Sequence, residues 1–284
     1  MTLPTCWKNS IVIQAALTQP VLDDKSFQGF QSLIFAAAGI HLSDAKRSMV
    51  AGRLAKRLKI LGQSDYRTYL ERIKRDPVEH QLAVNLLTTN ETWFFRESKH
   101  FDFLRNHILP NLSSSAPCRI WSAACSSGEE PYSIAMLLDD YFGSSSDWQI
   151  SASDISTRVL EAASQGHYPL ARAEHIPEAW LKRYCLRGTG EYDGSFLMNR
   201  SLRSRIHFCQ KNLDNLETFS KPFDVVFLRN VLIYFSPETK RKVVAAVLSQ
   251  LKPGGILMVG HSETLNGLST SVQTLAPSIY RKTG

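Results

Sequence analysis

The chain has 284 residues, of which 33 are Lys or Arg and 26 are Asp or Glu, so its formal net charge is +7. Hydrophobic residues make up 43% of the sequence and charged residues 21%, which excludes a disordered tail, a collagen-like repeat and a cysteine-rich secreted scaffold. The length predicts about two domains. The basic excess favours an acidic partner but does not choose among nucleic acid, an anionic membrane surface and an acidic protein face.

Targeting and metal-binding patterns are weak. The five cysteines show no C-x-x-C spacing, and the eight histidines show no metal-ligand spacing. No apolar run approaches the ~18 residues of a membrane span, and the apolar stretch at 11–17 is too interrupted for a signal-peptide core. We therefore expect a soluble, cytoplasmic, monomeric protein with no metal, no membrane insertion and an N-terminal extension over residues 1–21.

Residues 22–88 are predicted to form a small helical domain, because apolar positions recur at helical spacing with no strand-like alternation. Asp44 is a candidate N-cap for a helix over residues 45–61. One face of this helix is basic and carries Arg53, Lys56, Arg57 and Lys59. Such a face either meets water or docks an acidic partner, and the like-charge repulsion between Arg53 and Arg57 favours docking.

Residues 89–284 alternate short apolar runs with helical segments, which is typical of a parallel α/β sheet. Strands are predicted at 119–123, 148–152, 205–209, 223–228 and 256–260, with helices at 130–141, 157–164 and 237–251. Lys252 to Gly255 are interpreted as a helix stop. The predicted fold is a doubly wound, Rossmann-like sheet, interrupted by a glycine-containing insertion with turns or a small hairpin unit between the second and third strands.

Ligands of such sheets bind at the carboxyl ends of the strands. After the first strand, small residues from Ser122 to Gly128 allow a close backbone approach, and Glu129 and Glu130 then open a helix. Carboxylates at a helix start disfavour a pyrophosphate and favour a cationic ligand, although they also complement the helix dipole. Asp154 ends the second strand, where it either binds ribose hydroxyls or caps the next helix.

Asparagines follow the third and fourth strands. Asn212 and Asn230 are either turn residues or contacts to a ligand at the same sheet edge. The sequence contains no G-x-x-x-x-G-K-[ST], G-x-S-x-G or H-E-x-x-H motif, so P-loop phosphoryl transfer, elbow-type hydrolysis and zinc proteolysis lose their usual signals.

Five sequence blocks carry a resemblance to a known family. They are LTTNETWFFRE (87–97), WSAACSSGEEPYSIA (121–135), SASDIS (151–156), LRNVLIYF (228–235) and LKPGGILMVGHSE (251–263). With these blocks the chain resembles the CheR-type chemotaxis receptor methyltransferases, from about residue 22 to residue 282. That family transfers a methyl group from S-adenosylmethionine to receptor glutamates, leaving S-adenosylhomocysteine.

The resemblance implies a class I methyltransferase domain behind the helical domain, with a small β-insertion at about 181–208. It implies that Arg96 and Tyr234 lie beside the methyl-transfer site. It also implies a cofactor-binding set, in which Asp154 holds the ribose: Asn90, Thr92, Arg96, Glu130, Asp154, Asn212, Leu213, Asn230 and Val231.

The implied partners are the cytoplasmic domains of chemotaxis receptors, to which the protein would be recruited at the membrane. Their methylation regions are acidic helices, which gives the basic face of Arg53, Lys56, Arg57 and Lys59 a purpose. The insertion resembles a unit that grips a receptor's C-terminal peptide in some members. Two alternatives stay open: a non-catalytic S-adenosylmethionine-binding regulator and a nucleic-acid methyltransferase, although no D-P-P-Y-type signature supports the latter and no nucleic acid is expected as partner.

Overall fold

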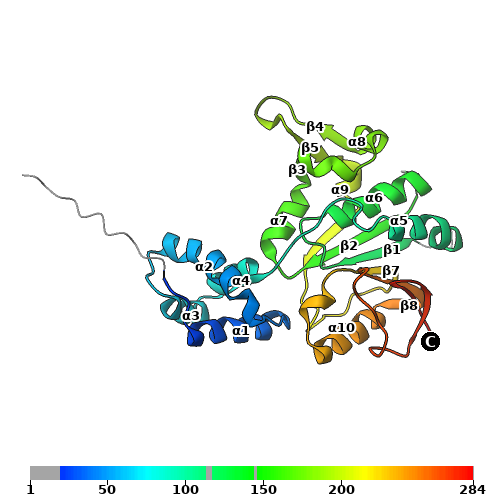
Figure 1. The fold of residues 1–284 in the computed structure, drawn as a ribbon. Coiled ribbons are helices and arrows are strands. Elements are labelled where there is room, and N and C mark those ends of the chain that lie inside the picture. The colour runs from blue at the N-terminus through cyan, green and yellow to red at the C-terminus, as the bar shows by residue number, and fades with distance from the viewer. Residues whose placement is uncertain (1–19, 113–116, 144–145, 284) are drawn as a thin grey trace, which may run out of the picture.

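The structure is a computed structural model that describes residues 20–112, 117–143 and 146–283. A group of four helices is followed along the chain by a sheet flanked by helices (Figure 1). The apolar stretch at 11–17 and most of the N-terminal extension expected at 1–21 lie outside the described residues. Within the described ranges, no helix is both long and apolar enough to cross a bilayer.

The helical domain consists of α1 (Asp24–Ala38), α2 (Arg47–Leu61), α3 (Tyr66–Arg75) and α4 (Pro77–Leu87). Aspartates cap three of these helices: Asp23, Asp65 and Asp76 each accept a main-chain N–H from the following first turn. The prediction of Asp44 as the cap of the remaining helix is wrong. Asp44–Lys46 form a 3-10 turn instead, so α2 begins three residues later than Asp44 and has no side-chain cap.

A seven-stranded sheet forms the second part, with the order β6-β2-β1-β7-β8-β10-β9. Its strands are β1 (Cys118–Ala123), β2 (Trp148–Asp154), β6 (Ile206–Gln210), β7 (Phe223–Leu228), β8 (Leu251–Val259), β9 (Val272–Ala276) and β10 (Ile279–Lys282). The first five confirm the predicted strands and pair in parallel. The last two were not predicted, and they make the sheet mixed because β10 runs antiparallel to both β8 and β9.

Helices cover both faces of this sheet (Figure 1). They are α6 (Glu129–Phe142), α7 (Thr157–Gln165) and α10 (Pro237–Ser249), preceded by the short α5 (Lys99–Phe103). Neighbouring residues of β1 point to opposite faces: Ile120 joins the core that contains α6, and Trp121 joins the core that contains α10. The expected helix stop at Lys252 to Gly255 is wrong, because α10 ends at Ser249 and these residues lie within β8.

The insertion forms a separate three-stranded sheet of order β3-β5-β4, which projects from the main sheet in Figure 1. It contains β3 (His167–Pro169), α8 (Glu178–Tyr184), β4 (Cys185–Arg187) and β5 (Ser195–Met198), and α9 (Arg200–Arg203) leads back to the main sheet. The expected range 181–208 is therefore displaced: it leaves out β3 and includes residues of β6, which belongs to the main sheet.

At the contact between the two domains, a side chain of each domain forms a hydrogen bond with a main-chain group of the other. Asn85, in α4, accepts the N–H of Thr157 at 3.0 Å, so the helical domain caps the start of α7. Asn212 donates to the Ala37 carbonyl in α1 at 2.9 Å. These contacts fix the helical domain at the carboxyl edge of the sheet, where strand order reverses around β1.

Candidate active site

A cavity of about 420 Å³ opens at this edge, with walls from both domains and from the segment that joins them. This is the place and size typical of a small-ligand site. All residues of the implied cofactor set lie on its wall, together with Tyr234: Asn90, Thr92, Arg96, Glu130, Asp154, Asn212, Leu213, Asn230 and Val231. The fold thus brings together side chains that are spread over much of the sequence.

Asp154 organises the loop after β1. Its carboxylate accepts the N–H of Ser126 at 2.9 Å and that of Ser156 at 2.9 Å. Asp154 does not cap α7, because the N–H of Thr157, the first residue of that helix, donates to Asn85 instead. The side chain is buried, and burial raises its pKa even though these N–H groups oppose the shift. A buried carboxylate on the cavity wall can accept hydrogen bonds from ribose hydroxyls.

The backbone of the cavity wall is unusual in three places. Ala124, Ser126 and Asn230 have φ values of +65°, +50° and +56°, in the left-handed region that residues other than glycine seldom occupy. Such strain costs about 1–3 kcal/mol per residue and persists only where the surroundings impose it. Here hydrogen bonds to Asp154 and Glu263 impose it on Ser126 and Asn230.

Arg229, which is itself part of the cavity wall, joins three segments of the chain. Its buried guanidinium donates to Glu130 at 2.9 Å, to Glu97 at 3.0 Å and to the main-chain carbonyl of Arg96. Glu130 also accepts from the Ser122 hydroxyl at 2.7 Å. Burial raises the pKa of Glu130, and the Arg229 charge opposes that shift. The Arg229 guanidinium thus connects the segment between the domains, the start of α6 and the end of β7.

Glu263 fixes the turn after β7. Its buried carboxylate accepts N–H groups from Asn230 at 2.8 Å, Gly260 at 2.7 Å and Ile233 at 3.3 Å. Because burial is the largest influence, the pKa of this carboxyl is raised. Gly260 leaves no room for a side chain, since a Cβ there would lie 2.6 Å from Asn230 Nδ2. Gly260 and Glu263, just after β8, therefore fix the conformation of the turn that carries Asn230 and Tyr234.

Arg96 and Tyr234 are both half-buried in the cavity wall. Arg96 donates to the Glu91 carbonyl at 2.9 Å, and its guanidinium stacks on Trp93 at 4.4 Å from the ring centroid. Burial raises the pKa of Tyr234, so its hydroxyl stays protonated at neutral pH, although the nearby Arg96 charge opposes the shift. The wall thus presents a cation and a hydroxyl donor.

Glu97, Arg229 and Glu263 received no role from the sequence, although all three lie inside the quoted blocks and Arg229 follows a predicted strand. The available signal was an ionisable residue at the end of an apolar run. Arg229 directly follows the buried strand β7, and such a charge is seldom buried without partners.

The four residues of the basic face do not share one environment. Lys56 and Lys59 are exposed. Arg53 donates to the Thr88 carbonyl at 2.8 Å, just beyond the end of α4, and to the Leu86 and Leu87 carbonyls. Arg57 binds Glu79 through two hydrogen bonds of 2.8 and 2.6 Å. The two arginines thus have internal roles that do not require a partner.

Comparison with known proteins decides the family. Residues 90–280 match the family model described as CheR methyltransferase, SAM binding domain, and residues 25–88 match the model described as CheR methyltransferase, all-alpha domain. The chain belongs to the CheR methyltransferase family. The resemblance seen in the sequence blocks is thereby confirmed, and the cavity lies where the CheR SAM-binding domain meets the all-alpha domain.

Curated relatives match along almost the whole chain. The chemotaxis protein methyltransferase of Escherichia coli (strain K12) is 39% identical over 279 residues, covering 97% of this chain and 96% of that protein. Chemotaxis protein methyltransferase 2 of Pseudomonas aeruginosa is 40% identical, covering 90% and 92%. The chemotaxis protein methyltransferase of Klebsiella aerogenes is 40% identical, covering 95% and 93%. The similarity to CheR proteins therefore includes both domains.

Proposed function

We propose that this protein transfers a methyl group from S-adenosylmethionine to glutamate side chains of chemotaxis receptors, giving methyl esters and S-adenosylhomocysteine. One observation carries the proposal. A single cavity in a chain of the CheR family gathers the implied cofactor-binding residues and the half-buried Arg96 and Tyr234. The names of the curated relatives supply the chemotaxis context.

The residues of the wall fit such a cofactor. Asp154 offers a buried acceptor for ribose hydroxyls, and Asn90 and Leu213 lie on the same wall. Glu130 would offer a carboxylate to the cationic part of the cofactor, and its negative charge is only partly offset because Arg229 also donates to Glu97. When bound, S-adenosylmethionine supplies a sulfonium methyl, which a carboxylate oxygen attacks while the electrons of the carbon–sulfur bond return to sulfur.

The chain itself has little proton chemistry to perform. A receptor glutamate is already ionised at neutral pH and needs no general base. Arg96 and Tyr234 would orient the carboxylate through charge and hydrogen bonding, and walls from both domains would keep water from the reacting atoms.

The direct test is incubation of the purified protein with methyl-labelled S-adenosylmethionine and receptor-containing membranes. We expect label on receptor bands that mild alkali releases as volatile methanol, because methyl esters are base-labile. Tight binding of S-adenosylhomocysteine without any transfer would favour the non-catalytic regulator instead. Label that transfers to nucleic acid in place of receptor would favour the other alternative.

Replacing Arg96 by alanine or Tyr234 by phenylalanine is expected to lower kcat about tenfold, the equivalent of about 1.4 kcal/mol in the barrier. The reason is that each change removes one orienting contact and leaves the buried supports of the cavity in place. Steady-state methylation assays and thermal unfolding of the same preparations measure the effect. Unchanged kcat in both variants would show that Arg96 and Tyr234 do not act at the methyl-transfer site.

Receptor docking is proposed on the helical domain and on the insertion. Lys56 and Lys59 are exposed, form no ion pair with any described residue and offer positive charge to an acidic receptor helix. The small sheet β3-β5-β4 is proposed to bind a receptor C-terminal peptide, with the protein acting as a cytoplasmic monomer recruited to membrane receptors.

A further inference from the structure

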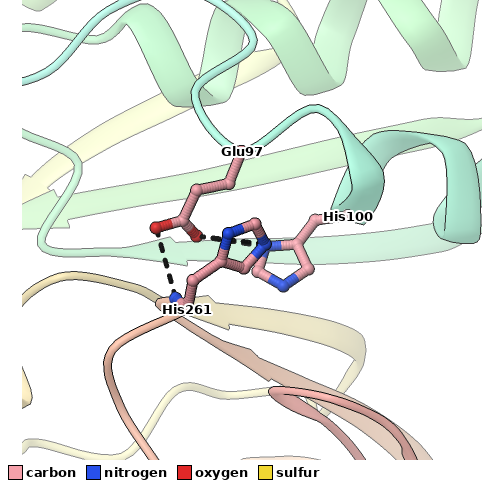
Figure 2. Close-up of side chains that lie close together, drawn as sticks. All are labelled: Glu97, His100 and His261. Carbon is pink, nitrogen blue, oxygen red and sulfur yellow. Dashed lines mark hydrogen bonds and ion pairs between the residues drawn. The ribbon is translucent and has the colours of Figure 1, made fainter.

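Glu97, His100 and His261 form a cluster next to the cavity (Figure 2). Glu97 follows the linker, His100 lies in α5 and His261 follows β8, so the two histidines are far apart in the sequence. Glu97 Oε2 lies 3.5 Å from His100 Nδ1 and 4.0 Å from His261 Nε2. The three candidate ligand atoms all lie within 4.8 Å of one another.

The hydrogen bonds of Ser278 determine where His100 carries its proton. The Ser278 hydroxyl donates its only hydrogen to the Pro277 carbonyl at 2.6 Å. Its 2.8 Å contact with His100 Nε2 therefore favours the tautomer in which Nε2–H donates and Ser278 accepts. His100 Nδ1 is then left with a lone pair.

That lone pair has no hydrogen-bond partner among the described residues, although the His100 side chain is only 1% exposed. It points toward the carboxylate of Glu97, so two acceptors face each other across a short gap. Buried polar atoms are seldom left in this state. Glu97 Oε2 already accepts from Arg229 at 3.0 Å, so a cation in this gap would satisfy the nitrogen of His100 and add a second positive neighbour to Glu97.

Charge and access also favour a cation. Glu97 and Glu130 together carry two negative charges, and they share the single positive charge of Arg229. These three side chains therefore carry a net charge of −1. The His261 side chain is 48% exposed, which gives an ion a path from solvent and leaves one side of the cluster open to water.

We propose that Glu97 Oε2, His100 Nδ1 and His261 Nε2 bind one divalent metal ion of the zinc type, with a water molecule completing the coordination. Two histidines and one carboxylate are a ligand set that zinc uses, with bonds of about 2.0–2.2 Å. Such bonds place ligand atoms about 3.3–3.5 Å apart. The 3.5 Å separation already suits them, the 4.0 Å separation needs to shrink by about half an ångström, and the two histidine nitrogens, within 4.8 Å, also need to approach each other. Ser278 holds the second nitrogen of His100, as outer-shell partners do in metal sites.

The ion would act as a structural clamp. Glu97 also accepts from Asn230 Nδ2 at 3.2 Å and from the His261 N–H at 3.2 Å. A metal on Glu97 would therefore join the linker and α5 to the end of β8, directly behind the turn that carries Asn230. Arg229 donates to the same carboxylate and repels the ion, so affinity should be moderate.

The test uses the tag-free full chain, freed of metal with a chelator and then titrated with Co²⁺ and, separately, with Zn²⁺. We expect one equivalent to bind, with visible Co²⁺ absorption of a low-symmetry site and a higher Tm in the presence of Zn²⁺. His261→Ala, at a half-exposed position that tolerates truncation, should weaken binding at least tenfold and abolish the Tm shift. His207→Ala, which removes an exposed histidine of β6 outside the cluster, should change neither.

No stoichiometric binding to the wild-type chain would overturn the proposal. So would equal affinity in wild type and His261→Ala, because the ion would then occupy other histidines. Neither readout depends on methyl transfer, so the outcome is independent of the proposed function.

Discussion

Asp154→Asn is expected to lower the affinity for S-adenosylhomocysteine about 100-fold. The substitution removes the charge that would accept the ribose hydroxyls, and hydrogen bonds to charged groups contribute about 1.5–3 kcal/mol each. In the native protein the carboxylate accepts hydrogen bonds from the main-chain N–H groups of Ser126 and Ser156. The asparagine side chain would place its NH₂ group, also a donor, against one of these two N–H groups. Together these losses correspond to about 3 kcal/mol of binding free energy. Isothermal titration of both proteins measures the change.

Asp140→Asn is the matched control. This aspartate lies near the other end of α6 and pairs with Arg105 at 2.8 Å and Arg183 at 3.3 Å, far along the helix from Glu130. Its replacement should leave the affinity unchanged. An Asp154→Asn protein that folds with wild-type Tm and binds as tightly as the control would show that the ribose contact is elsewhere.

Arg57→Ala is expected to lower the free energy of unfolding by about 3 kcal/mol, at the lower end of the range for breaking a buried ion pair. The reason lies in Glu79, whose side chain is 2% exposed and would lose both guanidinium hydrogen bonds while keeping only that of Tyr69 at 2.8 Å. Lys56→Ala and Lys59→Ala, on the same helix but exposed, should each change stability by less than about 0.5 kcal/mol. Urea unfolding of the three variants compares them.

The effect of Arg57→Ala should depend on pH. Hydrogen bonds from Arg57 hold the pKa of Glu79 below its ordinary value of 4.5 in the folded protein. The stabilisation by this depressed pKa is therefore present above 4.5 and is lost as pH falls through the folded pKa. The Arg57→Ala variant lacks this stabilisation, and protonation of Glu79 removes the unpaired buried charge in the variant. The stability difference between wild type and variant should therefore shrink as pH falls below 4.5. A stability difference that stays constant down to pH 3 would contradict this account.

Much of the fold was predictable from the sequence because the central strands are continuous apolar runs between polar turns. Residues 223–228, for example, are apolar apart from Asp224, as befits a strand with neighbours on both sides. Strands β9 and β10 were not predicted because both are short, and β9, the edge strand, has no buried residue. Asp44 was misplaced because a 3-10 turn, a frequent start of an α-helix, separates it from the first residue of α2.

The strand-end positions alone predicted that Asp154, Asn212 and Asn230 lie at the ligand-binding edge, although the asparagines could equally have been turn residues. The linker residues Asn90, Thr92 and Arg96 were predictable only through the family resemblance. The ion pairs that hold the cavity wall together were not predictable in the same way. The position of Arg229 after an apolar run indicates a charge that needs partners, but only the fold identifies Glu97 and Glu130, which are distant in sequence, as those partners. The histidine pair escaped for the same reason, because it depends on tertiary proximity and not on spacing along a helix.

The capping of α7 by Asn85 makes the two domains energetically interdependent. A chain without the helical domain would expose the first N–H of α7 and would also lose the part of the cavity wall that includes Ala38 and Met49. Because residues of both domains line the cavity, occupancy of the cavity and docking of the domains share one coupling free energy, which acts equally in both directions. A receptor helix that pulls on the helical domain would, by that reciprocity, also change how tightly the cavity retains the spent cofactor.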